Sequence, residues 1–385
     1  MSSFDLLALG QRLTAARGRA GLKQSDLAEA TALSQPTISR IEKGTADPKT
    51  LTVTVLTALA QATGLTIEHL VLGSPVADRV RLAARTPGPE PLAGAELSER
   101  ASEVVALLEL EDLLESRGVP GGQIAVKTLN PTVQGGSASA QGKRLAQQVR
   151  TECGLGFAPI ADIAELLTEL TGTDVAFLEL EGVSGLTAVD DVTGTTLVCA
   201  STKESPERQR FTLAHELCHL LLNEAHNSSS GGTSSAVETR AETFARHLLI
   251  PEDGVRHSMN RYLPQGQKFD DRHAARLAQH FGVSPTAAWV QLRSMRVLAA
   301  EGEAPTARSA ARMYGWSSER AAQEIAARQR RIPARIEQRA QEAYRESVVG
   351  LGVLARLTGE NLAEIAERLD MGRLEPHPAP EHASC

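Results

Sequence analysis

A histidine, a glutamate and a second histidine stand at the H-E-x-x-H spacing within a run of apolar residues. They are His215, Glu216 and His219. Because a helix turns about 100° per residue, the two imidazoles share one helix face and can take two corners of a zinc site. Glu216 projects near them and suits a general base for a water activated by zinc. Buried His and Glu side chains without partners are costly, so the pattern favours Zn²⁺ over two packed histidines.

The segment that carries this motif is predicted to be a buried helix. Ser205 can cap its N-terminus, and Pro206 suits its first turn. A Ser/Gly-rich loop is expected at 227–235, followed by a second helix that stops before Pro251. Catalytic zinc sites of this kind use two histidines, one carboxylate and a water. The second helix offers two carboxylates one turn apart, those of Glu238 and Glu242.

The residues alone leave the choice between these two carboxylates open. Glu238 also fits a capping box that begins at Ser235, with Glu238 at the third helical position, and Glu242 also fits a solvated helix position. His247 lies about 180° around the helix from Glu238, which excludes it as a ligand. The sequence assigns no donor for the developing oxyanion; the candidates are His226, His247 and Tyr262.

Length and composition limit the classes of protein that this chain can belong to. Its 385 residues predict two or three domains. The net charge of −7 gives no global attraction to nucleic acid, so any DNA contact must come from a local surface. The four cysteines are widely spaced, as in reduced cytosolic proteins. With no signal-peptide pattern and no apolar run near the ~18 residues of a membrane span, we expect a cytoplasmic protein without a membrane partner.

The first 72 residues read as consecutive short helices with helix-turn-helix spacing. Three stretches, LTAAR (13–17), LKQSDLA (22–28) and SQPTISRIEKG (34–44), resemble the lambda-repressor-like (XRE) helix-turn-helix family, and the resemblance extends over residues 9–72. It implies a double-stranded DNA operator as partner. By the family pattern Gln24 meets a phosphate, and the residues that face the major groove are Gln35, Thr37, Ser39 and Arg40.

The local charge of this region is small, which leaves an alternative open. Residues 1–73 hold seven Lys or Arg against six Asp or Glu, a net charge of +1. Phosphate attraction per monomer is therefore weak, and the same module can serve protein contacts with its polar residues simply solvated. We favour DNA binding, as a homodimer on paired half-sites.

The expected fold class is α+β and mainly α. An all-α helix-turn-helix domain (1–73) is followed by a linker with one amphipathic helix (74–142). A zincin-like domain (143–298) carries a small antiparallel sheet, with strands expected at 175–180, 186–190 and 195–200. A helical C-terminal extension (299–373) and a disordered tail (374–385) complete the chain.

Residues 207–251 resemble the ImmA/IrrE family of zinc metallopeptidases. The matching stretches are RQRFTLAHEL (208–217), HLLL (219–222), ETRAETFA (238–245) and LLIP (248–251). The resemblance implies Zn²⁺ as cofactor, held by His215, His219 and Glu238, with Glu242 as the second choice. The chain has Cys218 where the family commonly has Gly, and Glu242 where it commonly has Asn. Because Cys218 lies near His215 around the helix, a thiolate ligand is an alternative, although a packed, inert cysteine is favoured.

Together the two resemblances predict a DNA-bound zinc metallopeptidase that regulates transcription. It would hydrolyse a peptide bond in a repressor or another regulator under stress, with Glu216 as general base and the helix-turn-helix raising its concentration near the target. The main alternative is a transcription regulator whose zincin-like domain is a sensor without turnover. The retained Glu216 speaks against it, because a sensor needs no base beside its metal. A third reading is an antitoxin-type module paired with a neighbouring gene product.

Overall fold

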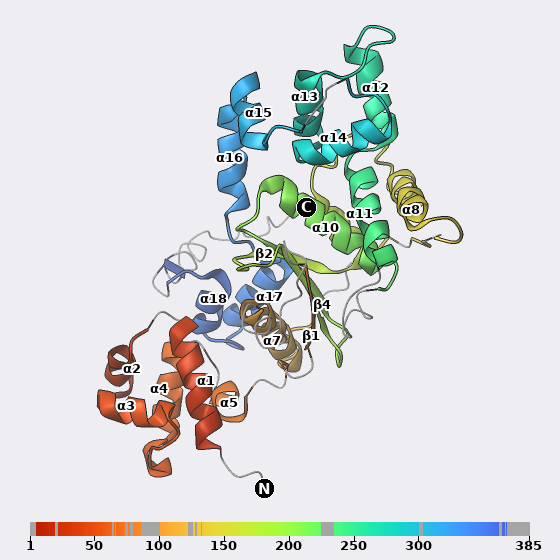
Figure 1. Ribbon diagram of the computed structural model, residues 1–385. Helices are drawn as coiled ribbons and strands as arrows, with labels where there is room; N and C mark the ends of the chain where they lie inside the picture. Colours follow the sequence, from red (N-terminus) through yellow and green to blue (C-terminus); the bar gives the residue numbers. More distant parts are fainter. Residues whose placement is uncertain are drawn as a thin grey trace, which may run out of the picture. The chain divides into compact units, whose positions relative to one another are not determined.

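The computed structural model describes residues 5–19, 22–63, 65, 67–73, 76–77, 80–85, 101–121, 126–127, 129–131, 133–224, 235–299, 303–361, 364–365 and 367. The chain forms two compact units (Figure 1). Met1–Asp78, Glu109–Gly121 and Ala334–Cys385 make up the first unit, and Arg79–Leu108 and Gly122–Pro333 the second. The expected tail at 374–385 lies outside the described residues, as does the expected loop at 227–235 except for Ser235.

The N-terminal part of the first unit is a set of short helices around an apolar core. They are α1 (Leu6–Arg19), α2 (Gln24–Thr31), α3 (Gln35–Glu42), a 3₁₀ turn (Pro48–Thr50), α4 (Val53–Thr63) and α5 (Ile67–Leu72). Ser34 caps α3 by accepting a hydrogen bond from the Thr37 amide, as expected. Ala32 adopts a left-handed conformation after α2, with φ of 55°, and this makes the tight turn between α2 and α3.

A four-stranded mixed sheet forms the base of the second unit. Its strands are β1 (Val80–Arg85), β2 (Asp174–Leu178), β3 (Gly185–Asp190) and β4 (Thr196–Ser201), in the order β1-β3-β4-β2. β3 is antiparallel to both β1 and β4, whereas β2 and β4 are parallel. The three expected strands are present, but the sheet is mixed rather than wholly antiparallel. Alternation of apolar residues predicts a strand without giving its direction.

Strand β1 lies within the stretch expected to be a linker, 74–142. Its residues pair with β3 from Val80 opposite Asp190 to Arg85 opposite Gly185. All six of its residues are only partly buried, as expected of an edge strand. The strand is short and the sequence after it is rich in proline, and this composition led to the linker interpretation.

Helix α10 (Pro206–Leu221) lies against the sheet, and its position depends on a close approach at Gly185 (Figure 1). Ser205 caps α10 by accepting from the Arg208 amide, and Pro206 occupies the first turn, as the sequence predicted. A Cβ atom on Gly185 would lie 2.3 Å from Cγ2 of Thr212 and 3.1 Å from the Cys199 carbonyl oxygen. Only glycine lets β3 come this close to the helix.

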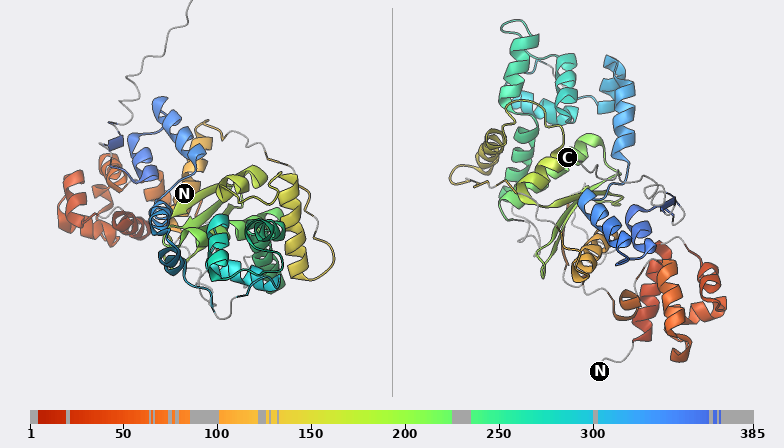
Figure 2. Two further views of the ribbon diagram at one scale, coloured as in Figure 1. Left: turned by 90° about the horizontal axis from the view of Figure 1, so that it is seen from above. Right: turned by 180° about the vertical axis from the view of Figure 1, so that it is seen from behind.

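Helix α11 (Ser235–Leu249) packs against α8 (Ala138–Glu152) as well as against α10 (Figure 2). The remaining helices of the second unit are α9 (Ile163–Thr171), α12 (Glu252–Tyr262), α13 (Asp271–Phe281), α14 (Pro285–Ser294), α15 (Ala307–Tyr314) and α16 (Ser317–Ala327). Helix α7 (Ser102–Ser116) spans the division between the units, and α17 (Ala334–Arg345) and α18 (Leu351–Thr358) belong to the first unit. No described helix is long and apolar enough to cross a membrane.

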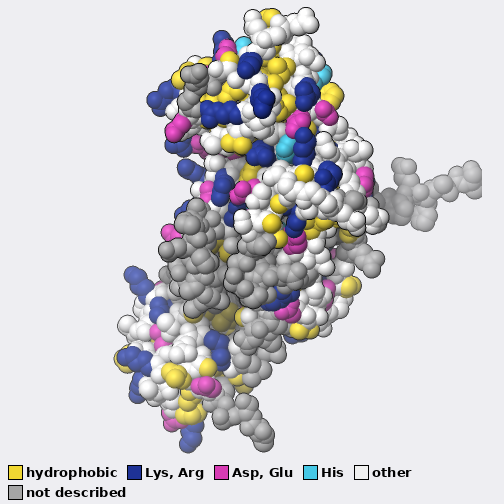
Figure 3. All heavy atoms as spheres, turned by 45° about the vertical axis from the view of Figure 1, so that its right-hand side comes forward, with side chains coloured by type: hydrophobic (Ala, Val, Ile, Leu, Met, Phe, Trp, Pro, Cys, Tyr) yellow, Lys and Arg dark blue, Asp and Glu magenta, His cyan; other side chains and the backbone are white. Residues whose placement is uncertain are grey.

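Basic side chains on the face seen in Figure 3 are interspersed with acidic and apolar ones rather than gathered in one patch. Two arginines of α15 and α16 are paired within the unit. Arg308 and Arg320 both bind Glu324, and Arg320 also binds Glu207. These two arginines therefore form local ion pairs.

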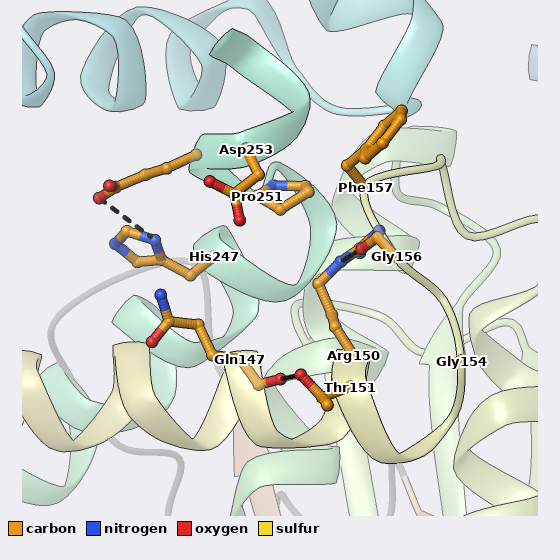
Figure 4. A pocket seen from close by; sticks show the side chains of 10 residues that line it. Gln147, Arg150, Thr151, Gly154, Gly156, Phe157, His247, Pro251 and Asp253 are labelled. Atoms are coloured by element: carbon orange, nitrogen blue, oxygen red, sulfur yellow. Dashed lines mark hydrogen bonds and ion pairs between the residues drawn. The ribbon is translucent and has the colours of Figure 1, made fainter. Parts of the chain in front are cut away.

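Helices α8, α11 and α12 surround a pocket of about 570 Å³ (Figure 4). The guanidinium of Arg150, at its wall, donates to the carbonyl oxygens of Gly156, Leu248 and Ala158, so it ties the chain together. His247 lies in the same wall, and its Nδ1 is 3.3 Å from Nε2 of Gln291. Burial lowers the pKa of His247 to about 4, because water cannot stabilise the imidazolium there.

We predict that the burial of His247 lowers the free energy of unfolding in mild acid. An unfolded histidine has a pKa near 6.5, so between that pH and about 4 only the unfolded chain binds this proton. Its contribution is complete above pH 6.5 and declines as the pH falls. Between pH 7 and pH 5 the metal-free wild type should lose about 2 kcal/mol more unfolding free energy than His247→Gln, which cannot titrate. Urea unfolding at both pH values measures this; equal losses in the two proteins would contradict it.

Candidate metal centre and helix-turn-helix surface

The two histidines of the H-E-x-x-H motif face each other on one side of α10. Nε2 of His215 lies 3.0 Å from Nε2 of His219, and both side chains are buried. Glu238, in the first turn of α11, brings its Oε2 to 3.1 Å from His215 Nε2 and its Oε1 to 3.7 Å from His219 Nε2. One ligand atom of each lies within 4.8 Å of the others. The structure therefore brings together the three residues that the sequence proposed as metal ligands.

The donor set fits a divalent metal ion. Each imidazole can turn the lone pair of its Nε2 toward the carboxylate of Glu238, so the three side chains can share one cation. Two imidazole nitrogens and one carboxylate are also the ligand types that catalytic zinc sites use. In the part of the chain that the structure describes, Nδ1 of His215 is buried without a hydrogen-bond partner.

The alternative ligands lie elsewhere. Glu242 is exposed, and its Oε1 is 4.0 Å from Nη2 of Arg85. Cys218 is fully buried and is not part of the cluster, and burial raises the pKa of its thiol to about 12. A thiol with so high a pKa stays protonated and packs as an apolar side chain. Ser235 is the first residue of α11, so the capping box that would have occupied Glu238 does not begin there.

Glu216 is held in place by the sheet. Thr187, on β3, donates from Oγ1 to Oε2 of Glu216 over 2.7 Å, and both residues are buried. The sequence did not identify Thr187 as part of the site, because a threonine in a strand is ordinarily read as a β-former. Its hydroxyl fixes the orientation of the carboxylate beside the two histidines.

A second carboxylate orients His219. Oε2 of Glu224 lies 3.4 Å from Nδ1 of His219, and Glu224 in turn binds Arg240. Burial lowers the pKa of His219, but the bond to Glu224 and the charges of Glu216 and Glu238 outweigh it, so its pKa is raised. Burial also lowers the pKa of His215, and for that residue the lowering prevails. A carboxylate on the far nitrogen of a ligating histidine is a common way to set the ring's orientation.

Helix α3 presents the predicted DNA-contacting side chains outward. Gln35 and Arg40 are exposed and Thr37 and Ser39 are partly exposed, while Ile38 and Ile41 are buried. The helix thus has one face in the core and a polar face toward solvent. Arg40 makes a long bond of 3.4 Å to the Pro36 carbonyl oxygen.

Gln24 has a structural partner within the same unit. Its Nε2 donates to Oε2 of Glu42 over 2.6 Å, and Nε of Arg17 binds the other oxygen of Glu42 over 2.5 Å. These bonds tie α1 and α2 to the C-terminal end of α3. The expected phosphate contact of Gln24 therefore has to coexist with this internal hydrogen bond.

Comparisons with known proteins agree with this division of the chain. Residues 8–71 match the model of a helix-turn-helix domain, and residues 169–293 match that of the IrrE N-terminal-like domain. The radiation response metalloprotease IrrE of Deinococcus radiodurans is 31% identical over 138 residues, which cover 34% of this chain and 39% of that protein. The corresponding protein of Deinococcus deserti is 30% identical over 160 residues, which cover 40% of this chain and 53% of that protein.

The two family models cover the metal-ligand cluster and helix α3, whereas the chain matches 39% and 53% of the length of the two relatives. The metal-ligand cluster lies entirely within the matched segment 169–293, and α3 lies within the matched segment 8–71. The chain accordingly joins a segment that matches a helix-turn-helix domain to a segment that matches the IrrE N-terminal-like domain.

Proposed function

We propose that this protein is a DNA-binding zinc metallopeptidase that hydrolyses a peptide bond in a transcriptional repressor or another regulator. One observation carries the proposal: His215, His219 and Glu238 converge beside the buried carboxylate of Glu216. That convergence lies in a segment that matches the IrrE N-terminal-like domain, and the relatives it matches are named radiation response metalloproteases.

In this proposal His215, His219 and Glu238 hold Zn²⁺. Bound there, the ion supplies a Lewis acid that lowers the pKa of water and polarises a carbonyl group. Glu216 accepts the proton of the attacking water and passes it to the leaving amine. Thr187 keeps the Glu216 carboxylate in position for both transfers. Glu224 holds the ring of His219 in one orientation.

The helix-turn-helix domain places this activity at a DNA operator. The exposed polar face of α3, with Gln35, Thr37, Ser39 and Arg40, enters the major groove, where Gln reads adenine and Arg reads guanine. The positive charge of this region is small, so the proposal includes binding as a homodimer, which doubles the number of phosphate contacts. A DNA-bound regulator is then a substrate at high local concentration. Such a protein acts in the cytoplasm.

The choice of Glu238 over Glu242 as ligand is directly testable. We expect Glu238→Ala to weaken zinc affinity by about a hundredfold or more, since loss of a ligand costs at least as much as loss of an outer partner. Glu242→Ala, a matched change one turn away, should alter it less than about threefold. Competition with a chromogenic chelator measures both affinities. The reverse order would place Glu242 at the metal.

Replacement of the general base separates catalysis from binding. Glu216→Gln keeps the size of the side chain and can still accept the Thr187 hydrogen bond, but it cannot take up a proton. Cleavage, scored by incubating the protein with the proteome of its host and mapping new peptide termini, should fall by about 10²–10⁴-fold. Zinc and DNA affinities should be unchanged.

Undiminished cleavage by Glu216→Gln would remove this residue as the base. New termini missing from both proteins, with zinc bound in both, would favour the alternative of a metal-binding sensor without turnover.

The DNA surface is tested by truncating Arg40. Against duplexes selected from a random pool by the wild type, Arg40→Ala should lose about 1–3 kcal/mol of binding free energy, because one base contact is removed. Arg117→Ala removes the same charge from an exposed site after α7 and serves as the control. Equal affinity of Arg40→Ala and the wild type, measured by fluorescence anisotropy, would move the groove contacts to other residues.

A further inference from the structure

None of the residues considered from sequence as oxyanion donors is placed by the structure at the metal centre. His247 lies in the wall of the pocket between α8, α11 and α12, with Gln291 on its Nδ1. Tyr262, the last residue of α12, is 63% exposed. His226 falls outside the described residues.

An arginine from strand β1 contacts both helices that carry the metal-ligand cluster. Arg85 is the last residue of β1, and its carbonyl oxygen accepts a hydrogen bond from the Ser184 amide over 2.8 Å. Its guanidinium carbon lies 5.3 Å from the ring centroid of Phe211, one turn before His215 on α10. Its Nη2 lies 4.0 Å from Oε1 of Glu242, one turn after Glu238 on α11. The side chain is thus placed between the two helices that carry the cluster.

One donor of this guanidinium has nothing to bind. Nη1 of Arg85 is buried and has no hydrogen-bond partner in the described part of the chain. Leaving a buried charged donor unsatisfied is costly, and proteins retain such groups where a ligand supplies the acceptor. An arginine remains charged in any such environment, and its hydrogen bonds are strongest to an oxygen atom that carries or gains negative charge.

The surrounding charges support this position. Burial lowers the pKa of Arg85 and the charge of Arg208 lowers it further, while those of Glu216, Glu242 and Glu238 act in the opposite direction. Arg85 in turn contributes to the lowered pKa of His215. Its charge is therefore felt both by the general base and by the metal ligands, as required of a group that acts on the same reacting atoms.

We propose that Arg85 is a catalytic residue whose Nη1 donates a hydrogen bond to the carbonyl oxygen of the scissile peptide as that oxygen becomes negative. The proposal rests on the peptidase function proposed above. A charge-assisted bond of this kind is strong and acts where charge develops in the transition state. Glu242 anchors the other end of the guanidinium, which gives that exposed carboxylate a positioning role.

Arg85 comes from a part of the chain outside the segment that carries the metal-ligand cluster. Arg85 lies outside the segment 169–293 that matches the IrrE N-terminal-like domain, on a strand at the start of the second unit. The pairing of β1 with β3 holds it in place, with Arg85 opposite Gly185. The active site of this chain is therefore completed by a strand from the segment that follows the helix-turn-helix.

Two small probes test this assignment without knowledge of the substrate. The full-length protein is loaded with Co²⁺, and its visible absorption is titrated with methylphosphonate, a tetrahedral anion, or with acetohydroxamate, a planar metal chelator. Arg85→Gln should weaken methylphosphonate binding by about tenfold or more and change acetohydroxamate binding less than about threefold. Arg85→Lys, which keeps the charge, should restore part of the loss. Arg81→Gln is the matched control, because Arg81 lies on the same strand and pairs with Asp191.

Two kinds of result would contradict the proposal for Arg85, and they differ in whether the peptidase function survives. Equal affinities of wild type and Arg85→Gln for methylphosphonate would overturn the assignment, as would an equal loss for both probes or the same loss in Arg81→Gln. Failure of the wild type to bind Co²⁺ or either probe would instead reject the metallopeptidase function itself, and the assignment with it.

Discussion

Two imidazole nitrogens held 3.0 Å apart in a buried place, with a carboxylate 3.1 Å from one of them, form the constraint on which the second unit depends. In water such groups would turn away from one another or take up protons. Here α10 and α11 hold them together in a buried place. A cation at their centre would bind all three groups, and this is why we place the proposed function of the chain there.

The fold serves this constraint through close approaches that few residue types permit. Gly185 lets β3 come against Thr212, one turn before the cluster, and two residues further along β3 Thr187 reaches Glu216. On the other side of β3, strand β1 delivers Arg85 to the same region. One strand of the sheet thus orients Glu216, the proposed general base, and the neighbouring strand carries Arg85.

The sequence was most informative where local chemistry decides the structure. The helix that carries the motif could be predicted from the cap at Ser205, from Pro206 and from the apolar run. The i, i+4 spacing predicted that His215 and His219 share one helix face. The cap at Ser34 similarly gave α3. Choosing between Glu238 and Glu242 needed the family resemblance, because Glu238 also fits a capping box and Glu242 also fits a solvated helix position. In the structure Glu238 lies in the cluster, which supports that choice without measuring it.

The structural features that the sequence could not predict depend on contacts between distant segments. The six residues of β1 carry no signal of their partner β3, about a hundred residues later, so they were read as linker. The parallel pairing of β2 with β4 is likewise set by the chain's path rather than by either strand. The internal bond of Gln24 to Glu42 and the proposed role of Arg85 also arise only when separate elements meet.

The proposed zinc site is tested most directly by the X-ray absorption spectrum of the zinc-loaded protein. We predict only nitrogen and oxygen ligands at about 2.0 Å, with the scattering pattern of two imidazoles. A sulfur ligand at about 2.3 Å would place Cys218 at the metal and contradict the account.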